Sequence, residues 1–337
     1  MSITAGVFTE TTLVNIQAKA DAIWMDRIQK MDYVPEAKVA ECIIAQTTAK
    51  FGALKGKKDP SIDVGWVNAC DVSAQSCTDC TIVPTELSTN IEEYYLNRER
   101  CAEFSACEND FRTNFFDIED VIAKGFLKAS LALDEWWAAQ AVAVLNASVG
   151  VNESDGGKGN VVGTNTFVAP AYWSADLMGY FARVATVNRF KNPMLISGLN
   201  LYESVWTAEW EKCCENGSGK FGTMDMCFDL FNIDSVNDPA YVTYMLNKGA
   251  LAFVTKCYYE GATASNPVKY MDQHRWTMPS FSLPGVCYDV HYENKCYDCG
   301  DFFEHNFKLK TLGDIFLNPV GCTATRTGVL EFECGEE

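Results

Sequence analysis

The sequence predicts an α+β fold, and three patterns carry this prediction. Apolar residues return to one broad helical face over residues 118–147. Apolar residues alternate with polar residues or glycine in residues 62–66, as they do in a half-buried strand. Beyond residue 165, segments with helical periodicity alternate with short apolar runs, which is typical of helices packed on a mixed sheet.

The composition is that of a globular, acidic chain. It has 337 residues, 48% of them hydrophobic, with 45 Asp and Glu against 27 Lys and Arg and a net charge of -18. This hydrophobic content is too high for a disordered chain. Because nucleic-acid affinity depends on clustered Lys and Arg, the charge argues against a general DNA- or RNA-binding role.

Neither a targeting segment nor a membrane span is predicted. Residues 1–10 lack the basic and apolar regions of a secretory signal. The longest weakly charged apolar run, residues 129–149, is interrupted by Asp134, Glu135 and Gln140, so it is too polar to cross a bilayer. No membrane partner is therefore expected.

The first 50 residues are expected to form a helical arm. Leu13, Ile16 and Ile23 recur at helical spacing and give residues 11–31 one apolar stripe. A second, short helix is expected over residues 36–50.

A long hairpin is expected next. Ile62, Val64 and Trp66 form the apolar side of its first strand, the second strand is expected at residues 81–83, and residues 71–80 form the tip. A two-stranded hairpin has no core of its own. Because neither this strand nor the arm has an evident partner within the chain, both are expected to contact another subunit.

The strongest periodic signal follows an extended, charged segment over residues 91–104. The helix predicted over residues 118–147 would be about 45 Å long at 1.5 Å per residue, and we interpret it as a structural spine. Residues 149–165 are polar and rich in glycine, which indicates a boundary with a second domain.

The second half is expected to mix helices and strands. The sequence predicts helices at residues 171–188, 199–213 and 239–247, strands at 193–197 and 250–258, a hairpin of 285–292 with 302–309, and a last strand-like segment, 314–334, that returns to the first domain.

No catalytic motif is present. Residues 216–221 have Phe221 where a phosphate loop needs Ser or Thr, and residues 156–159 follow a helix, which is the wrong context for a dinucleotide fingerprint. The chain has three histidines and no G-x-S-x-G elbow. An enzyme is therefore not predicted.

Cysteine is the residue type with the most specific spacing. Cys77 and Cys80 form one C-x-x-C pair, and Cys296 and Cys299 form another, both at predicted hairpin tips. This spacing lets two thiolates bind one zinc ion, but it also suits disulfides within or between chains, or free thiols. Structural zinc is the one candidate cofactor. A cytosolic Cys-rich metal-binding protein or metalloenzyme is accordingly the alternative function.

The other cysteines are given a simpler interpretation. Cys42, Cys227 and Cys257 have apolar neighbours and are expected to be small buried side chains. The total of 15 is odd, so at least one thiol lies outside any intrachain pairing.

The order of these elements resembles the major capsid proteins of tailed bacteriophages with the Hong Kong 97-type fold. The resemblance is carried by the hairpin at residues 53–83, the helix at residues 118–147 and the closing run YDVHYENKC…LKTLGDIFLNPVGC. It implies an N-terminal arm at 1–50, an extended E-loop-like hairpin at 51–83, a peripheral domain at 84–150 and 312–337 with the spine helix, and an axial α/β domain at 151–311.

The resemblance implies a structural virion protein that is made in the host cytoplasm. Its subunits would assemble into pentamers and hexamers of an icosahedral head, which encloses double-stranded DNA without sequence-specific binding. Portal, scaffolding and head-decoration proteins are the further partners that it implies. The expected subunit-contact residues are Leu13, Ile16, Ile23, Ile62, Val64 and Trp66.

Overall fold

The computed structural model describes most of the chain. The described residues are 8–30, 37–56, 58–67, 89–111, 117–152, 159–162, 165–168, 176–198, 201, 218–221, 224–229, 232–233, 242–270, 273–295, 303–319 and 327–334. They divide into unit 1 (Met1–Glu41, Leu96–Ala138 and Val254–Asp314) and unit 2 (Cys42–Tyr95, Ala139–Phe253 and Ile315–Glu337). No helix among the described residues has the length and apolar character needed to span a bilayer.

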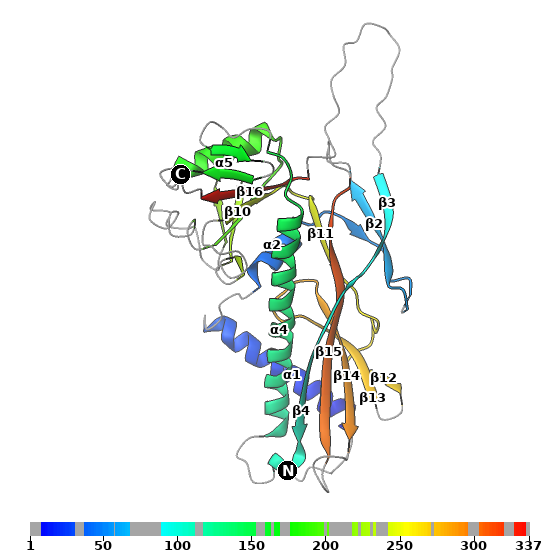
Figure 1. The fold of residues 1–337 in the computed structure, drawn as a ribbon. Coiled ribbons are helices and arrows are strands. Elements are labelled where there is room, and N and C mark those ends of the chain that lie inside the picture. Colours follow the sequence, from blue (N-terminus) through cyan, green and yellow to red (C-terminus); the bar gives the residue numbers. More distant parts are fainter. Residues whose placement is uncertain are drawn as a thin grey trace. The chain divides into compact units, whose positions relative to one another are not determined.

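Unit 1 is built on an antiparallel sheet. Its strands run in the order β12 (Val268–Tyr270), β13 (Gln273–Pro279), β14 (Cys287–Lys295), β15 (Glu304–Leu317) and β4 (Arg98–Cys107), and they lie side by side in Figure 1. A further strand, β11 (Leu251–Thr255), also pairs with β15. The helices are α1 (Glu10–Gln29), the short α3 (Glu108–Phe111) and the first part of α4 (Ile118–Ala147). The predicted hairpin of residues 285–292 with 302–309 is confirmed as β14 and β15.

Alternation along the strands gives the sheet of unit 1 one buried face. On β13, His274, Trp276 and Met278 are buried, whereas the residues between them are partly exposed. Aromatic rings fill the space between this face and α4: the Phe126 ring centroid lies 5.1 Å from that of Phe307. Large buried rings contribute much of a core's apolar area and favour tilted and edge-on contacts.

Helix α4 has the bounds that the periodicity predicts, Ile118–Ala147. Glu119 and Asp120 lie in its first turn, where the helix dipole favours negative charge. The Asp117 carboxylate accepts a hydrogen bond from the Glu119 N–H at 3.3 Å, which satisfies one of the unpaired donors of that turn. A broad buried face and favourable first-turn charge together account for a 30-residue helix.

Unit 2 contains a small antiparallel sheet of β1 (Lys50–Phe51), β2 (Ser61–Val67) and β3 (Thr89–Tyr95). The partner of β2 is thus β3, with Ile62 opposite Tyr94, and not the expected strand at residues 81–83, which lies outside the described residues. The extended segment predicted at residues 91–104 is confirmed, but it is divided between β3 and β4. The second predicted helix is the shorter α2 (Lys38–Gln46).

A seven-stranded mixed sheet forms the larger part of unit 2. Its order is β5 (Gly159–Val162), β6 (Asn165–Val168), β16 (Val329–Cys334), β10 (Val242–Leu246), β7 (Met194–Ser197), β9 (Met224–Phe228) and β8 (Ser218–Phe221). Helix α5 (Asp176–Val187) shares one core with it, in which Phe181, Leu195, Met226 and Phe332 are buried. The predicted strand at residues 193–197 is confirmed as β7, and that at residues 250–258 as β11.

One expectation for the second half is wrong. The helix expected at residues 239–247 is the strand β10, because its five residues are all buried and pair with β7 on one side and β16 on the other. A continuous apolar run cannot be assigned to strand or helix by periodicity alone. The strand character expected for the last segment is confirmed by β16, which pairs with β10 and β6 in the sheet of unit 2, and its return to the first domain stays a prediction. Residues 171–175 and most of residues 199–213 lie outside the described residues.

Gly313 in β15 provides a test of the packing in unit 1. A Cβ at this position would lie 2.4 Å from the Val254 carbonyl oxygen and 3.0 Å from the Trp137 ring. We expect Gly313→Ala to lower the free energy of unfolding by about 2 kcal/mol, because backbone cannot yield as a flexible side chain can. Chemical denaturation of the full chain measures this effect.

The matched control is Gly179→Ala, at an exposed position of α5 with nothing within 4 Å of the added Cβ. The free energy of unfolding of this variant should rise by up to about 1 kcal/mol, because alanine has a higher helix propensity than glycine. Equal stabilities for the two variants would contradict the close approach at Gly313.

Candidate functional site

Helix α1 is packed on unit 1 through one apolar face. Leu13 and Ile16 are fully buried, Trp24 is buried, and Ile23 is partly buried. The Thr9 side chain caps the helix by accepting the Thr12 N–H at 3.3 Å. The expectation that this face has no partner inside the chain is therefore wrong, and a role of Leu13, Ile16 and Ile23 in subunit contacts stays a prediction.

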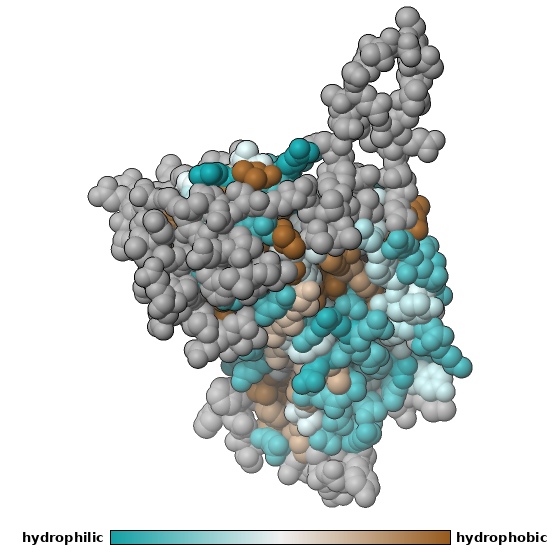
Figure 2. Space-filling model, turned by 45° about the horizontal axis from the view of Figure 1, so that its top comes forward, coloured by the Kyte–Doolittle hydropathy of each residue, from teal (hydrophilic) through white to brown (hydrophobic). Residues whose placement is uncertain are grey.

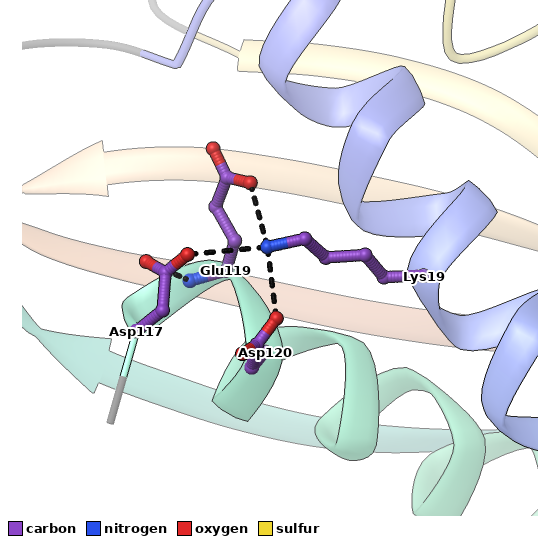
Figure 3. A network of polar contacts seen from close by, with 4 residues as sticks. All are labelled: Lys19, Asp117, Glu119 and Asp120. Carbon is purple, nitrogen blue, oxygen red and sulfur yellow. Dashed lines mark hydrogen bonds and ion pairs between the residues drawn. The ribbon is translucent and has the colours of Figure 1, made fainter. Parts of the chain in front are cut away.

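A cluster of charges joins α1 to the start of α4 (Figure 3). The Lys19 Nζ lies 3.1 Å from Asp117, 3.0 Å from Glu119 and 2.8 Å from Asp120. Partial burial lowers the pKa of Lys19, but hydrogen bonds to these three carboxylates outweigh it and raise the pKa above its ordinary value. One ammonium thus reduces the repulsion among three carboxylates, although two negative charges remain in excess.

A second contact fixes the residues that precede α1. The Phe8 ring stacks on the His305 ring with centroids 3.8 Å apart, and the Phe8 N–H donates to the Tyr292 hydroxyl at 3.0 Å. His305 Nδ1 lies 2.9 Å from that hydroxyl, and Nε2 lies 3.0 Å from the Glu108 carboxylate. Burial lowers the pKa of His305, although Glu108 opposes the shift. These contacts hold the start of the described arm against β14 and β15.

Replacing Lys19 tests how strongly this cluster holds α1. We expect Lys19→Met to lower the free energy of unfolding by about 1–2 kcal/mol, because three carboxylates lose their shared counter-ion while the apolar stem is kept. Urea denaturation at low and high salt measures the loss, which should shrink as salt rises.

Lys30→Met is the control, because Lys30 forms an exposed ion pair with Asp26 at 2.7 Å. Its effect should stay below about 0.5 kcal/mol. If Lys19→Met lowers the free energy of unfolding by no more than Lys30→Met does, the role of the cluster is contradicted.

The predicted strand residues of the hairpin are also buried within the chain. Ile62 and Val64 have no exposed area, and Trp66 is 1% exposed. The Trp66 Nε1–H donates to the Tyr94 hydroxyl at 3.2 Å, and the Tyr94 ring lies 4.5 Å from that of Phe316. The structure contradicts the premise that they lack an intrachain core, so their contact with another subunit stays a prediction.

Asp134 on α4 is a strongly perturbed carboxyl group of unit 1. Its side chain is 1% exposed and accepts hydrogen bonds from the hydroxyls of Ser280 at 2.8 Å, Ser282 at 2.7 Å and Tyr288. Burial raises the pKa of Asp134 to about 6, and the hydroxyl donors limit the rise. The carboxyl group ties α4 to the turn before β14.

Asp134 predicts a pH dependence of stability. Its folded-state pKa of about 6 is above its ordinary value of 3.8, so its contribution is fully present below pH 3.8 and is lost as pH rises through about 6. Between pH 4 and 7, the stability difference between wild type and Asp134→Asn should therefore change by up to about 3 kcal/mol.

Denaturation curves at several pH values measure this change. Asp59→Asn, at an exposed position, is the control and should leave the pH profile unchanged. A profile of Asp134→Asn that is parallel to that of the wild type would contradict the assignment.

The cysteine candidates Cys77, Cys80, Cys296 and Cys299 all lie outside the described residues. Their metal or disulfide role stays a prediction. Among the described residues, no group of three or more His, Cys, Asp or Glu side chains is placed to hold a metal ion.

Other cysteines of the described residues form disulfides. Cys42 pairs with Cys227 across 185 residues, and Cys257 pairs with Cys287 across 30 residues. The expected burial of Cys42, Cys227 and Cys257 is confirmed, and the disulfides add that residues far apart in sequence meet in the fold. Cys101 on β4 is a free, exposed thiol.

The second face of the sheet in unit 1 is polar and forms a groove of about 530 Å³ over β13, β14, β15 and β4. Arg275, His291, Lys308 and Glu103 form one row across it, as the strand register requires. Figure 2 shows hydrophilic residues over much of the side on which β12 and β13 lie in Figure 1. Burial, followed by Arg275, Lys310 and Lys308, lowers the pKa of His291 to about 4.

This groove was not predicted. The signal that could have found it is the alternation in residues 273–279 and 287–295, where polar side chains occupy every second position. Its cations, Arg275 and Lys308, come from β13 and β15, and their positions in one row depend on a strand register that the sequence does not state.

No protein-family model matches the chain, and no curated protein matches its sequence. Solved structures with some similarity include "Capsid structure of the Cyanophage P-SCSP1u", at 10% identity and a TM-score of 0.46 over 85% of this chain and 86% of that one. A chain from Mycobacterium phage Che8 has 10% identity and a TM-score of 0.44 over 85% of this chain and 92% of the other. "Capsid of Ralstonia phage GP4" has 8% identity and a TM-score of 0.43 over 84% and 85%.

Proposed function

We propose that the chain is a structural shell subunit of a tailed-bacteriophage head, with a Hong Kong 97-type fold. The observation that carries the proposal is the order of elements around α4. An N-terminal helical arm and a small sheet precede this 30-residue helix, and a mixed sheet with one covering helix, α5, follows it. The sequence resemblance implies the same order.

The length of α4 suits a shell subunit. Its residues up to Ala138 belong to unit 1 and the later residues to unit 2, so one helix runs through both. Mean helix length in globular proteins is about 11–12 residues, so α4 is well over twice as long as an average helix and suits a structural member of a shell subunit.

The finer proposal concerns assembly. Subunits meeting through different surfaces close into rings, which gives the pentamers and hexamers of an icosahedral head. The net charge of -18 suits a shell that encloses double-stranded DNA without binding it tightly. Portal, scaffolding and decoration proteins belong to the same proposal, as does the division into arm (1–50), hairpin (51–83), peripheral domain (84–150 and 312–337) and axial domain (151–311).

The outward face of α1 supports a role of the arm in subunit contacts. Val14, Met25 and Ile28 are 36%, 52% and 45% exposed and lie outside the buried stripe of α1. Large apolar side chains exposed at helical spacing are typical of a surface that another chain covers. They are better candidates than Leu13 and Ile16, which the chain itself buries.

The proposed function is tested with the purified full chain. We expect closed particles, or rings of five and six subunits, in negative-stain electron microscopy and sedimentation velocity. Met25→Glu should shift chains toward free subunits, whereas Asn15→Glu, which adds the same charge at another exposed position of α1, should not. Monomers or dimers under all salt conditions, with bound zinc and turnover of a substrate, would overturn the proposal in favour of a metalloenzyme.

A further inference from the structure

Arg275 on β13 is a partly buried cation without a counter-ion among the described residues. Its two terminal nitrogens donate to the Tyr259 hydroxyl at 2.8 Å and to the Gln273 side-chain oxygen at 2.7 Å. Its Nε is buried and has no hydrogen-bond partner. A guanidinium has five N–H donors, so these neutral contacts leave most of its capacity unused.

An arginine without a counter-ion is unusual in a chain with 45 acidic and 27 basic residues. The carboxylates that line the same groove have other partners: Glu103 binds Lys308 at 2.6 Å, and Glu293 accepts from Gln273 at 3.1 Å and pairs with Lys295. A cation that has lost part of its water is costly unless an anion pairs with it. The geometry therefore points to an anion that is supplied from outside the subunit.

The surroundings of Arg275 are those of a protein contact. Val268 lies opposite Arg275 on the edge strand β12 and is 48% exposed, and Tyr270 on the same strand is 61% exposed. The Arg275 Cζ lies 5.9 Å from the Tyr259 and Tyr270 ring centroids. Arg and Tyr are enriched among the residues that dominate binding energy at protein interfaces. Beyond β12, the described residues supply no further strand to this edge of the sheet.

We propose that Arg275 and the edge strand β12 form an interface with a second copy of this chain, and that a carboxylate of that copy pairs with the Arg275 guanidinium. The inference rests on the proposed function, in which copies assemble. Charge complementarity selects the occupant: a copy carrying 45 Asp and Glu offers many carboxylates, and this face offers a guanidinium that lacks one.

The experiment compares assembly of the full-length wild type, Arg275→Gln, Arg275→Lys and Arg183→Gln. Arg183 is an exposed residue of α5, so its replacement removes the same charge at another place. We expect Arg275→Gln to raise the subunit concentration for half-assembly at least about tenfold. The half-assembly concentration of Arg275→Lys should lie between those of Arg275→Gln and the wild type, because lysine keeps the charge but lacks the planar guanidinium. Arg183→Gln should behave as wild type.

Hydrogen exchange of the wild type keeps the test decisive if a variant fails to fold. Residues 268–279 should be protected in assembled particles relative to free subunits. Wild-type assembly without this protection, or equal assembly of Arg275→Gln and Arg183→Gln, would overturn the inference while leaving the proposed function in place. If the wild type forms no particles at all, the proposed function itself fails.

The alternative partner of the Arg275 guanidinium is a small free anion instead of a carboxylate of a second copy. If inorganic phosphate raises the thermal midpoint of wild-type subunits but not of Arg275→Gln, and the two assemble equally, the face binds free anions and the interface is excluded. Assembly that depends on Arg275 and is insensitive to phosphate supports the interface.

Discussion

Unit 1 depends on the burial of aromatic rings between α4 and one face of the antiparallel sheet. Phe126 from the helix contacts Phe307 and Phe104 from two neighbouring strands, with ring centroids 5.1 and 5.4 Å apart. Such contacts require the helix to lie close to the strands, and Gly125 permits this where a Cβ would lie 2.6 Å from the Phe104 ring. Contacts at Lys19, Asp134 and His305 then hold α1, the turn before β14 and Phe8 on this layer.

Local sequence patterns predicted helices and strands correctly where one face of the element is buried and the other is exposed to solvent. The bounds of α4 and the positions of β7, β14 and β15 follow from such patterns. The pattern failed at β10, because a strand buried on both faces has no polar positions from which a period can be read. It also failed for the partner of β2, because pairing is decided by the register of residues far along the chain.

The features that bear on function were the least visible in the sequence. Ile62, Val64 and Trp66 were correctly placed on one face of a strand, but whether that face is covered by the chain itself depends on contacts that the sequence does not show. Arg275 and the groove around it lie on the sheet face that β13, β14, β15 and β4 form together. Single-strand alternation marks such side chains as polar, and only the assembled sheet shows which of them lack a counter-charge.

The disulfide between Cys42 and Cys227 has a mechanical consequence. It joins α2 to β9 directly, although 185 residues separate the two in sequence. A tensile load applied near residue 42 would reach the seven-stranded sheet through a covalent bond, without first pulling on the hydrogen bonds of the strands between them. Hydrogen bonds loaded one after another in a sheet yield at low force, whereas a covalent tie carries tension until a bond breaks. The disulfide therefore limits how far α2 can be drawn away from β9.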